Sequence, residues 1–116
     1  MYTTDYKTVT VNGDISDDYA TEINLSAQVR GGGEVYLTWS ISGGGAPNGF
    51  QVMWALYANP TYPSPYEGVE WLSKEVSSYT VTGLDPGKTY HFRVGIYRIE
   101  GGGCVLYSND VAVNVT

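Results

Sequence analysis

Apolar and polar residues alternate along most of the chain with a period of two, and this pattern predicts β-strands rather than helices. β-Branched and aromatic residues dominate these segments, as is typical of strands. Seven segments fit the pattern: Glu22–Arg30, Glu34–Ile41, Phe50–Tyr57, Gly68–Leu72, Ser77–Thr82, Lys88–Ile99 and Cys104–Val115. Short strands separated by turns in this way are typical of an antiparallel β-sandwich.

The alternation also assigns each side chain to a face, because successive residues of a strand point to opposite sides. Four sets are predicted to face the core: Val35, Leu37, Trp39 and Ile41; Phe50, Val52, Trp54 and Leu56; Tyr90, Phe92, Val94 and Ile96; and Val111, Val113 and Val115. Two sets are predicted to face outward: Gln51, Met53, Ala55 and Tyr57; and His91, Arg93, Gly95 and Tyr97.

The connections between strands carry strong turn residues. Three glycine triplets, Gly31–Gly33, Gly43–Gly45 and Gly101–Gly103, fall where strands must reverse. The connection Ala58–Glu67 differs, because three prolines make it stiff and non-helical. Residues 1–21 are the least regular part and hold one short possible strand, Thr8–Val11. We therefore expect an irregular N-terminal segment or linker over residues 1–21 and one domain over residues 22–116.

The composition narrows the classes of partner. The 116 residues suffice for one domain with its own core. Twelve acidic residues against six basic ones give a net charge of −6, which is opposite to the basic surface that nucleic acids or anionic membranes attract. No apolar run approaches the ~20 residues that span a bilayer. We expect a monomer that binds no nucleic acid and does not insert into a membrane.

Few residues offer catalytic or metal-binding chemistry. One cysteine, Cys104, cannot form an internal disulfide, and it is predicted to be a small buried apolar residue. The one histidine, His91, lies inside a predicted strand and is expected to point outward, away from any set of acids. The oxygen-rich turn from Asn12 to Asp18 lacks the spacing of a calcium loop. The sequence thus predicts no enzyme activity, no cofactor and no metal.

One segment closely resembles the region around the fifth and sixth strands of a fibronectin type III domain. It runs from Tyr79 to Val94 and contains Leu84-Asp85-Pro86-Gly87 followed by Tyr90, Phe92 and Val94. In that family the tyrosine hydroxyl bonds back to upstream backbone at a corner between strands. The resemblance covers about residues 22–116 and implies a seven-stranded fibronectin type III-like, immunoglobulin-like sandwich. The low charge and abundant Tyr and Gly resemble bacterial members of the family.

The resemblance implies a function as well as a fold. We expect a non-catalytic spacer or protein-interaction module within a larger extracellular or cell-surface protein. Its partners would be neighbouring domains of the same chain, and a polysaccharide or another surface protein. The loop between the last two predicted strands lacks Arg-Gly-Asp, so integrin binding through that motif is not supported.

Four aromatic residues near the proline-rich connection form the candidate ligand site: Tyr57, Tyr62, Tyr66 and Trp71. Tyr and Trp rings present flat apolar faces with a polar end, which suits a sugar ring or a protein surface. Two interpretations remain open. The rings are exposed and roughly coplanar, as carbohydrate binding requires, or the connection folds back and they cover an open part of the sandwich.

A second candidate surface is the outward face of the third and sixth predicted strands. Met53, Tyr57, Arg93 and Tyr97 would form one patch there. Met, Tyr and Arg are enriched at protein interfaces, so this patch would suit protein recognition. Tyr also favours exposed strand positions without any binding role.

Overall fold

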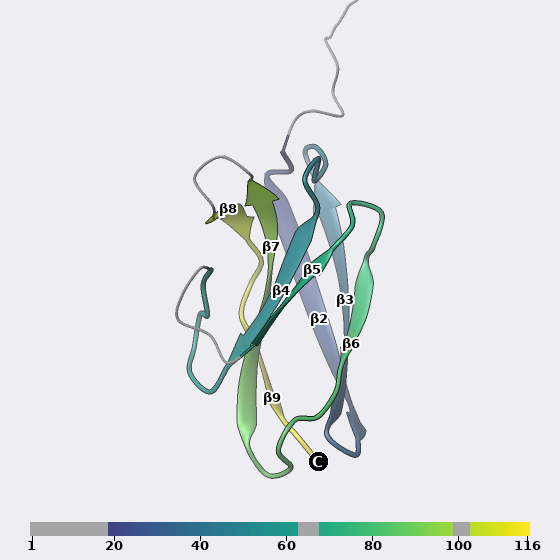
Figure 1. Cartoon of the computed structure of the whole chain (residues 1–116), viewed down its shortest axis with the longest axis vertical. Coiled ribbons are helices and arrows are strands. Elements are labelled where there is room, and N and C mark those ends of the chain that lie inside the picture. The colour runs from purple at the N-terminus through teal and green to yellow at the C-terminus, as the bar shows by residue number, and fades with distance from the viewer. Residues whose placement is uncertain (1–18, 63–67, 99–102) are drawn as a thin grey trace, which may run out of the picture.

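The alternating segments form two facing antiparallel sheets (Figure 1). The computed structural model describes residues 19–62, 68–98 and 103–116. Within these residues one sheet contains β2 (Glu22–Gly31), β3 (Glu34–Ser42) and β6 (Ser78–Val81). The other contains β5 (Gly68–Leu72), β4 (Phe50–Ala55), β7 (Thr89–Arg98), β8 (Gly103–Tyr107) and β9 (Val111–Asn114). No helix occurs in the described residues, so none there could cross a membrane.

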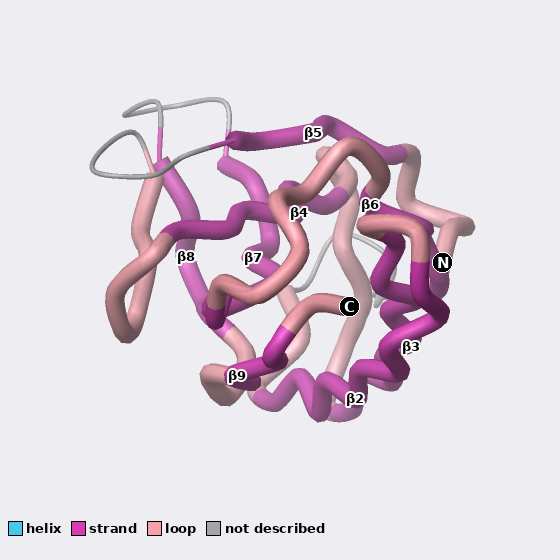
Figure 2. Tube along the Cα trace, turned by 90° about the horizontal axis from the view of Figure 1, so that it is seen from below, coloured by secondary structure: helices cyan, strands magenta, loops and turns pink. Residues whose placement is uncertain are grey.

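The order of the strands places β4 and β7 at the centre of the larger sheet. The smaller sheet runs β2-β3-β6, and the larger runs β5-β4-β7-β8 with β9 also paired to β7. The end-on view shows the two sheets enclosing one interior (Figure 2). The first described residues enter at the top of Figure 1 and the C-terminus lies at the bottom, so the chain enters and leaves at opposite ends.

The interior is filled by the side chains that the alternation predicted. Val35, Leu37 and Trp39 of β3 are buried. The Trp39 ring contacts the Phe50 ring of β4 across the interior, with centroids 5.6 Å apart. The inward residues of β7 that follow Tyr90, namely Phe92, Val94 and Ile96, are fully buried. Each such side chain contributes roughly 1.5–3 kcal/mol through burial. The prediction fails at Leu56, which is 42% exposed because β4 ends at Ala55.

The predicted corner between β6 and β7 is confirmed. The backbone N–H of Asp85 donates to the hydroxyl of Tyr90 at 3.1 Å, and Leu84 and Tyr90 are both buried. Gly33 of the first glycine triplet stabilises this corner, because its carbonyl accepts from the N–H of Leu84. Gly33 has φ of +78°, and a Cβ there would lie 2.5 Å from the Leu84 carbonyl oxygen. Only glycine fits this position.

The last predicted strand, Cys104–Val115, is two strands in the structure, which gives eight described strands instead of seven. β8 pairs with the C-terminal half of β7 and β9 with its N-terminal half. At the break the N–H of Ser108 still donates to the Val94 carbonyl at 2.8 Å, and side chains supply further bonds. The Ser108 hydroxyl accepts from the N–H of Val94 at 2.9 Å, and the Asn109 amide bonds both the N–H and the C=O of Leu25 on β2. Such side-chain bonds to backbone compete with regular strand pairing.

The described chain begins with a contact to the loop after β3. Tyr19 forms a parallel bridge with Gly45, and the N–H of Ala20 donates to the Gly45 carbonyl at 2.8 Å. Ala20 is buried in the core. The predicted strand Thr8–Val11 and the oxygen-rich turn lie outside the described residues. The sandwich therefore includes chain from Tyr19 onward.

Candidate functional site

The outer face of the larger sheet is covered by the chain that follows β4. We call residues 56–62 the strap. Pro60 of the strap is fully buried, as are Gln51, Met53 and Ala55 on the outward side of β4. The prediction that these three β4 residues are exposed is therefore wrong, and the Met53 patch does not exist as a surface. Alternation assigned the face correctly, but the strap turns that face into a second packed layer.

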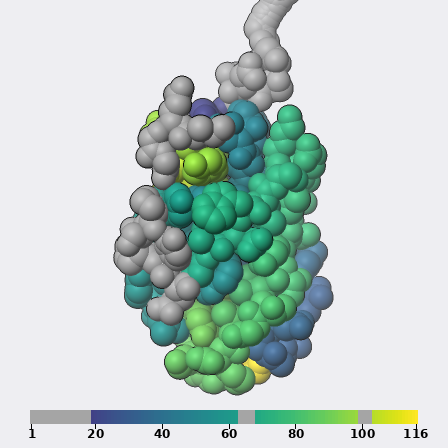
Figure 3. All heavy atoms as spheres, viewed as in Figure 1, coloured from purple at the N-terminus to yellow at the C-terminus, as the bar shows by residue number. Residues whose placement is uncertain are grey.

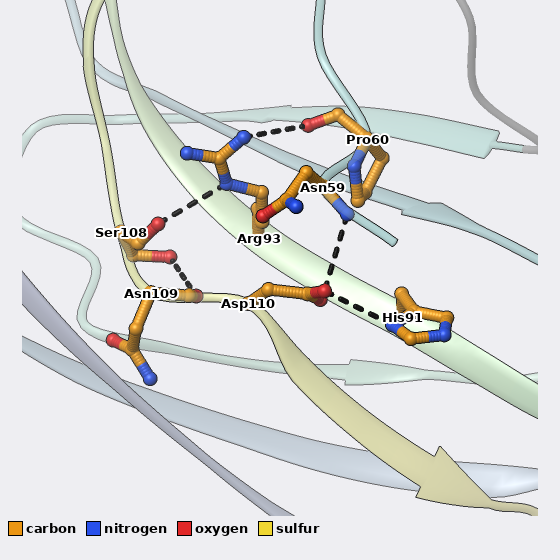
Figure 4. A network of polar contacts seen from close by, with 7 residues as sticks. All are labelled: Asn59, Pro60, His91, Arg93, Ser108, Asn109 and Asp110. Atoms are coloured by element: carbon orange, nitrogen blue, oxygen red, sulfur yellow. Dashed lines mark hydrogen bonds and ion pairs between the residues drawn. The ribbon is translucent and has the colours of Figure 1, made fainter. Parts of the chain in front are cut away.

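Polar contacts hold the strap to β7 and to the break between β8 and β9 (Figure 4). The N–H of Asn59 donates to Oδ2 of Asp110 at 3.1 Å, and Nη1 of Arg93 donates to the Pro60 carbonyl at 3.4 Å. Nε of the same arginine donates to the Ser108 carbonyl at 3.1 Å. Arg93 thus joins the strap to the sheet, and it is engaged with the chain itself rather than offered to a partner.

A second attachment lies at the end of the strap. The hydroxyl of Tyr107 on β8 accepts from the N–H of Tyr62 and donates to the Tyr62 carbonyl, each at 3.0 Å. The Arg93 guanidinium lies 4.5 Å from the centroid of the Tyr107 ring. Burial raises the pKa of the Tyr107 hydroxyl above its usual value of 10.0, so Tyr107 is neutral at physiological pH and able to donate. The strap is thus held at its middle and at its end.

The structure brings together two of the four predicted site residues. The Tyr62 ring contacts the Trp71 ring with centroids 5.7 Å apart and planes at 81°, and it also contacts Tyr97 at 6.4 Å. Tyr62 is half-buried and covers the sheet, while Trp71 is 53% exposed and Tyr57 is 41% exposed. Tyr62 and Trp71 do not form a coplanar platform. Tyr66 lies outside the described residues.

The exposed tryptophan belongs to the strand at the edge of the sheet. β5 pairs with β4 alone, with Trp71 opposite Gln51. Figure 3 shows the teal-green atoms of β5 at the surface in the centre of this face of the molecule. The Tyr62 and Trp71 rings meet edge to face, and Trp71 keeps more than half of its surface exposed.

Among the residues that the structure describes, the acid that contacts His91 is Asp110. Nδ1 of His91 is 3.0 Å from Oδ2 of Asp110, the same oxygen that accepts from Asn59. In the described part of the chain no group of three His, Cys, Asp or Glu side chains could hold a metal ion. The role that the geometry supports for His91 is to orient Asp110 toward the strap.

Sequence analysis missed a contact between Cys104 of β8 and Gln51 of β4. The Cys104 thiol donates to Oε1 of Gln51 at 3.2 Å, across the intervening strand β7. Burial raises the pKa of the Cys104 thiol from 9.0 to about 11, partly offset by a hydrogen bond to Tyr107 and the charge of Arg93. Cys104 is half-buried, so the prediction of a buried apolar residue describes it only in part.

The comparisons with known proteins agree with this architecture. A sequence profile of the fibronectin type III domain matches residues 19–113. The structure is similar to the FN1–FN3 domains of chicken CNTN1, with a TM-score of 0.62 and 16% identity over 78% of this chain and 30% of that one. No curated protein matches the chain.

Two further solved structures are similar over most of their own length. The fn3 domain of human contactin 1 has a TM-score of 0.61 and 15% identity, with 95% of this chain and 87% of that one covered. An Fn3-like protein from Clostridium thermocellum has a TM-score of 0.58 and 23% identity, with 80% and 88% covered. At these identities the similarity shows a shared fold.

Proposed function

Because this chain belongs to the fibronectin type III family, we propose that it is a non-catalytic spacer or interaction module of a larger secreted or cell-surface protein. Domains of this family are generally modules that space or connect other parts of a chain. The observation that carries the proposal is the entry and exit of the chain at opposite ends of the sandwich (Figure 1). This geometry adds length when modules are joined in series.

The proposal of a spacer is tested by joining two copies in tandem. Small-angle X-ray scattering would compare the maximum dimension of the tandem chain with that of the single chain. A spacer predicts an extended particle whose length grows by about one further module, with the melting temperature unchanged. A compact tandem particle would contradict the spacer role. A single copy that elutes as a dimer in size-exclusion chromatography would contradict the expectation that the chain is a monomer.

The contacts of His91 and Asp110 support the proposal that the module is non-catalytic. Asp110 is the acid beside His91 in the described residues, where it accepts from the Asn59 N–H of the strap and contacts His91. Acid–base catalysis needs a group free to exchange a proton with a substrate.

A second candidate function is carbohydrate binding at the edge of the larger sheet, favoured by the open ring of Trp71 beside Tyr62. Retention on insoluble polysaccharides would be measured for the native chain and for Trp71→Ala and Tyr62→Ala. Carbohydrate binding predicts retention that Trp71→Ala abolishes and that Val29→Ala, an exposed apolar residue on the other sheet, leaves intact. A native chain that no polysaccharide retains overturns this function and leaves the spacer proposal standing.

A further inference from the structure

Gly95 in the middle of β7 has no side chain, and this allows Gln51 of β4 and Cys104 of β8 to meet across β7. Gly95 pairs with Gln51 of β4 on one side and with Tyr107 of β8 on the other. A Cβ at this position would lie 2.6 Å from Sγ of Cys104. Its φ lies outside the left-handed region, so the turn chemistry that usually explains glycine does not apply. Glycine inside a strand marks the close approach of another group, and here that group is the thiol.

The side chain that the thiol reaches is a buried primary amide. Gln51 has no exposed surface, and its Oε1 accepts from the thiol at 3.2 Å. Its Nε2 is a buried donor that has no hydrogen-bond partner among the described residues. An unsatisfied buried donor destabilises the folded protein. The amide oxygen of Gln51 therefore contacts the Cys104 thiol, while its NH₂ group has no hydrogen-bond partner among the described residues.

We propose that Cys104 and Gln51 react to form an internal thioester, and that this bond is a covalent site for primary amines. The sulfur forms a bond to the side-chain carbonyl carbon of Gln51, and the bond from that carbon to Nε2 breaks. The thiol proton passes to the departing nitrogen, which leaves as ammonia. The step is a substitution at one carbonyl carbon, so it needs no oxidant and no further reactant.

Two observations favour this step, namely the contact between the two side chains and the unpartnered NH₂ group. The carbonyl carbon that the sulfur would attack is bonded to the contacted oxygen, so the two reacting groups are already adjacent. The reaction removes the unpartnered NH₂ group and with it a buried unsatisfied donor. Burial raises the pKa of the Cys104 thiol to about 11, so the step starts from the protonated thiol, and its proton is the one that the leaving nitrogen receives.

The thioester would give the sheet a new reactivity. A primary amine attacks the thioester carbonyl, forms an amide on the Gln51 side chain and releases the Cys104 thiol, which takes the proton lost by the amine. Gln51 has no exposed surface and Cys104 beside it is half-buried, so the amine reaches the carbonyl through local opening of the outer layer at Cys104 and not through the core. This inference does not depend on the proposed spacer function.

The experiment is intact-mass measurement of the purified native chain together with a count of thiols after denaturation. The thioester predicts a mass lower than that of the sequence by one ammonia and no free thiol. Incubation of the folded chain with methylamine then restores one thiol and places a methylamide on the peptide that contains Gln51, as tandem mass spectrometry would show. A native chain with the full mass and one titratable thiol overturns the proposal.

Controls separate the thioester from other losses of ammonia. The chain contains Asn12-Gly13 and Asn48-Gly49, and Asn-Gly pairs can also lose ammonia by cyclising. The mass deficit is expected to vanish in Cys104→Ala and in Gln51→Ala, whereas Asn48→Ala keeps it. Gly95→Ala, which puts a methyl group in the path of the sulfur, is expected to abolish the deficit as well. A deficit that persists in Cys104→Ala overturns the proposal, even if the variant of Gly95 fails to fold.

Discussion

The outer faces of the two sheets differ although both follow the same alternation of apolar and polar residues. On the smaller sheet the outward residues Asn24, Ser26 and Ser40 are exposed. On the larger sheet the outward residues Gln51, Met53 and Ala55 are completely buried. The strap makes the difference, because it adds a packed layer on one sheet and leaves the other in water. A period of two thus defines which way a side chain points but not whether it is buried.

The largest expected loss of stability comes from a residue between the two sheets, and it is the reference for the other variants. Trp39→Ala removes an indole from between the sheets, where it contacts Phe50, and is expected to lower the free energy of unfolding by about 3–5 kcal/mol. Urea denaturation followed by circular dichroism measures it. A loss below about 1 kcal/mol would contradict the placement of Trp39 in the core, since surface substitutions remain near that size.

Met53→Ala is the direct test of the second layer. If the strap makes a core of its own, the substitution is expected to lower the free energy of unfolding by about 2–5 kcal/mol, as for an interior methionine. Thr38→Ala, on the outer side of the smaller sheet, is the matched control and is expected to change it by less than about 0.5 kcal/mol. Equal small effects in the two variants would show that the outer faces are alike and that the strap does not pack.

Tyr90→Phe probes the corner that both sheets share. The substitution removes the hydroxyl that accepts from Asp85 and is expected to lower the free energy of unfolding by about 1–3 kcal/mol. Tyr36→Phe, on an outer strand face, serves as the control for loss of a tyrosine hydroxyl. If Tyr90→Phe melts at the native temperature, the corner hydrogen bond does not contribute to stability.

Asp110→Ala is expected to have the smallest effect on global stability and the most local one. It removes the acceptor of the Asn59 N–H and the partner of His91, with an expected loss of about 1–2 kcal/mol. Hydrogen exchange of strap amides should rise while that of β3 stays unchanged, because the strap opens locally before the core does. Uniform acceleration in both regions would argue against a separately held strap.

The inner half of this architecture could be predicted because local pattern determines it. The buried faces of β3 and β7 follow from alternation alone, and the corner follows from Leu84, Pro86, Gly87 and Tyr90 in a short segment. The outer layer could not be predicted in the same way, because it depends on where the stiff segment after β4 lies. Prolines show that this segment is not helical, but they do not show that Pro60 is buried.

The contact between Gln51 and Cys104 was beyond sequence reasoning for a related reason. The two residues come from strands that are separated by a third strand and by most of the second half of the chain. The observable clue was Gly95, a glycine among outward-facing positions of a strand where no turn is needed. The break at Ser108–Asp110 was missed similarly, since alternation of apolar residues continues on both sides of it.

The bonds of Asn109 to Leu25 tie the end of the chain to its beginning, and this has a consequence for the order of folding. Residues 84 positions apart must meet before the exposed edge of β2 is satisfied. Val115, fully buried, also bonds Lys88 and so completes the lower part of the sandwich. Contacts this distant in sequence slow folding. During synthesis, therefore, the domain cannot complete its packing before Asn109 and Val115 have left the ribosome and can reach β2 and Lys88.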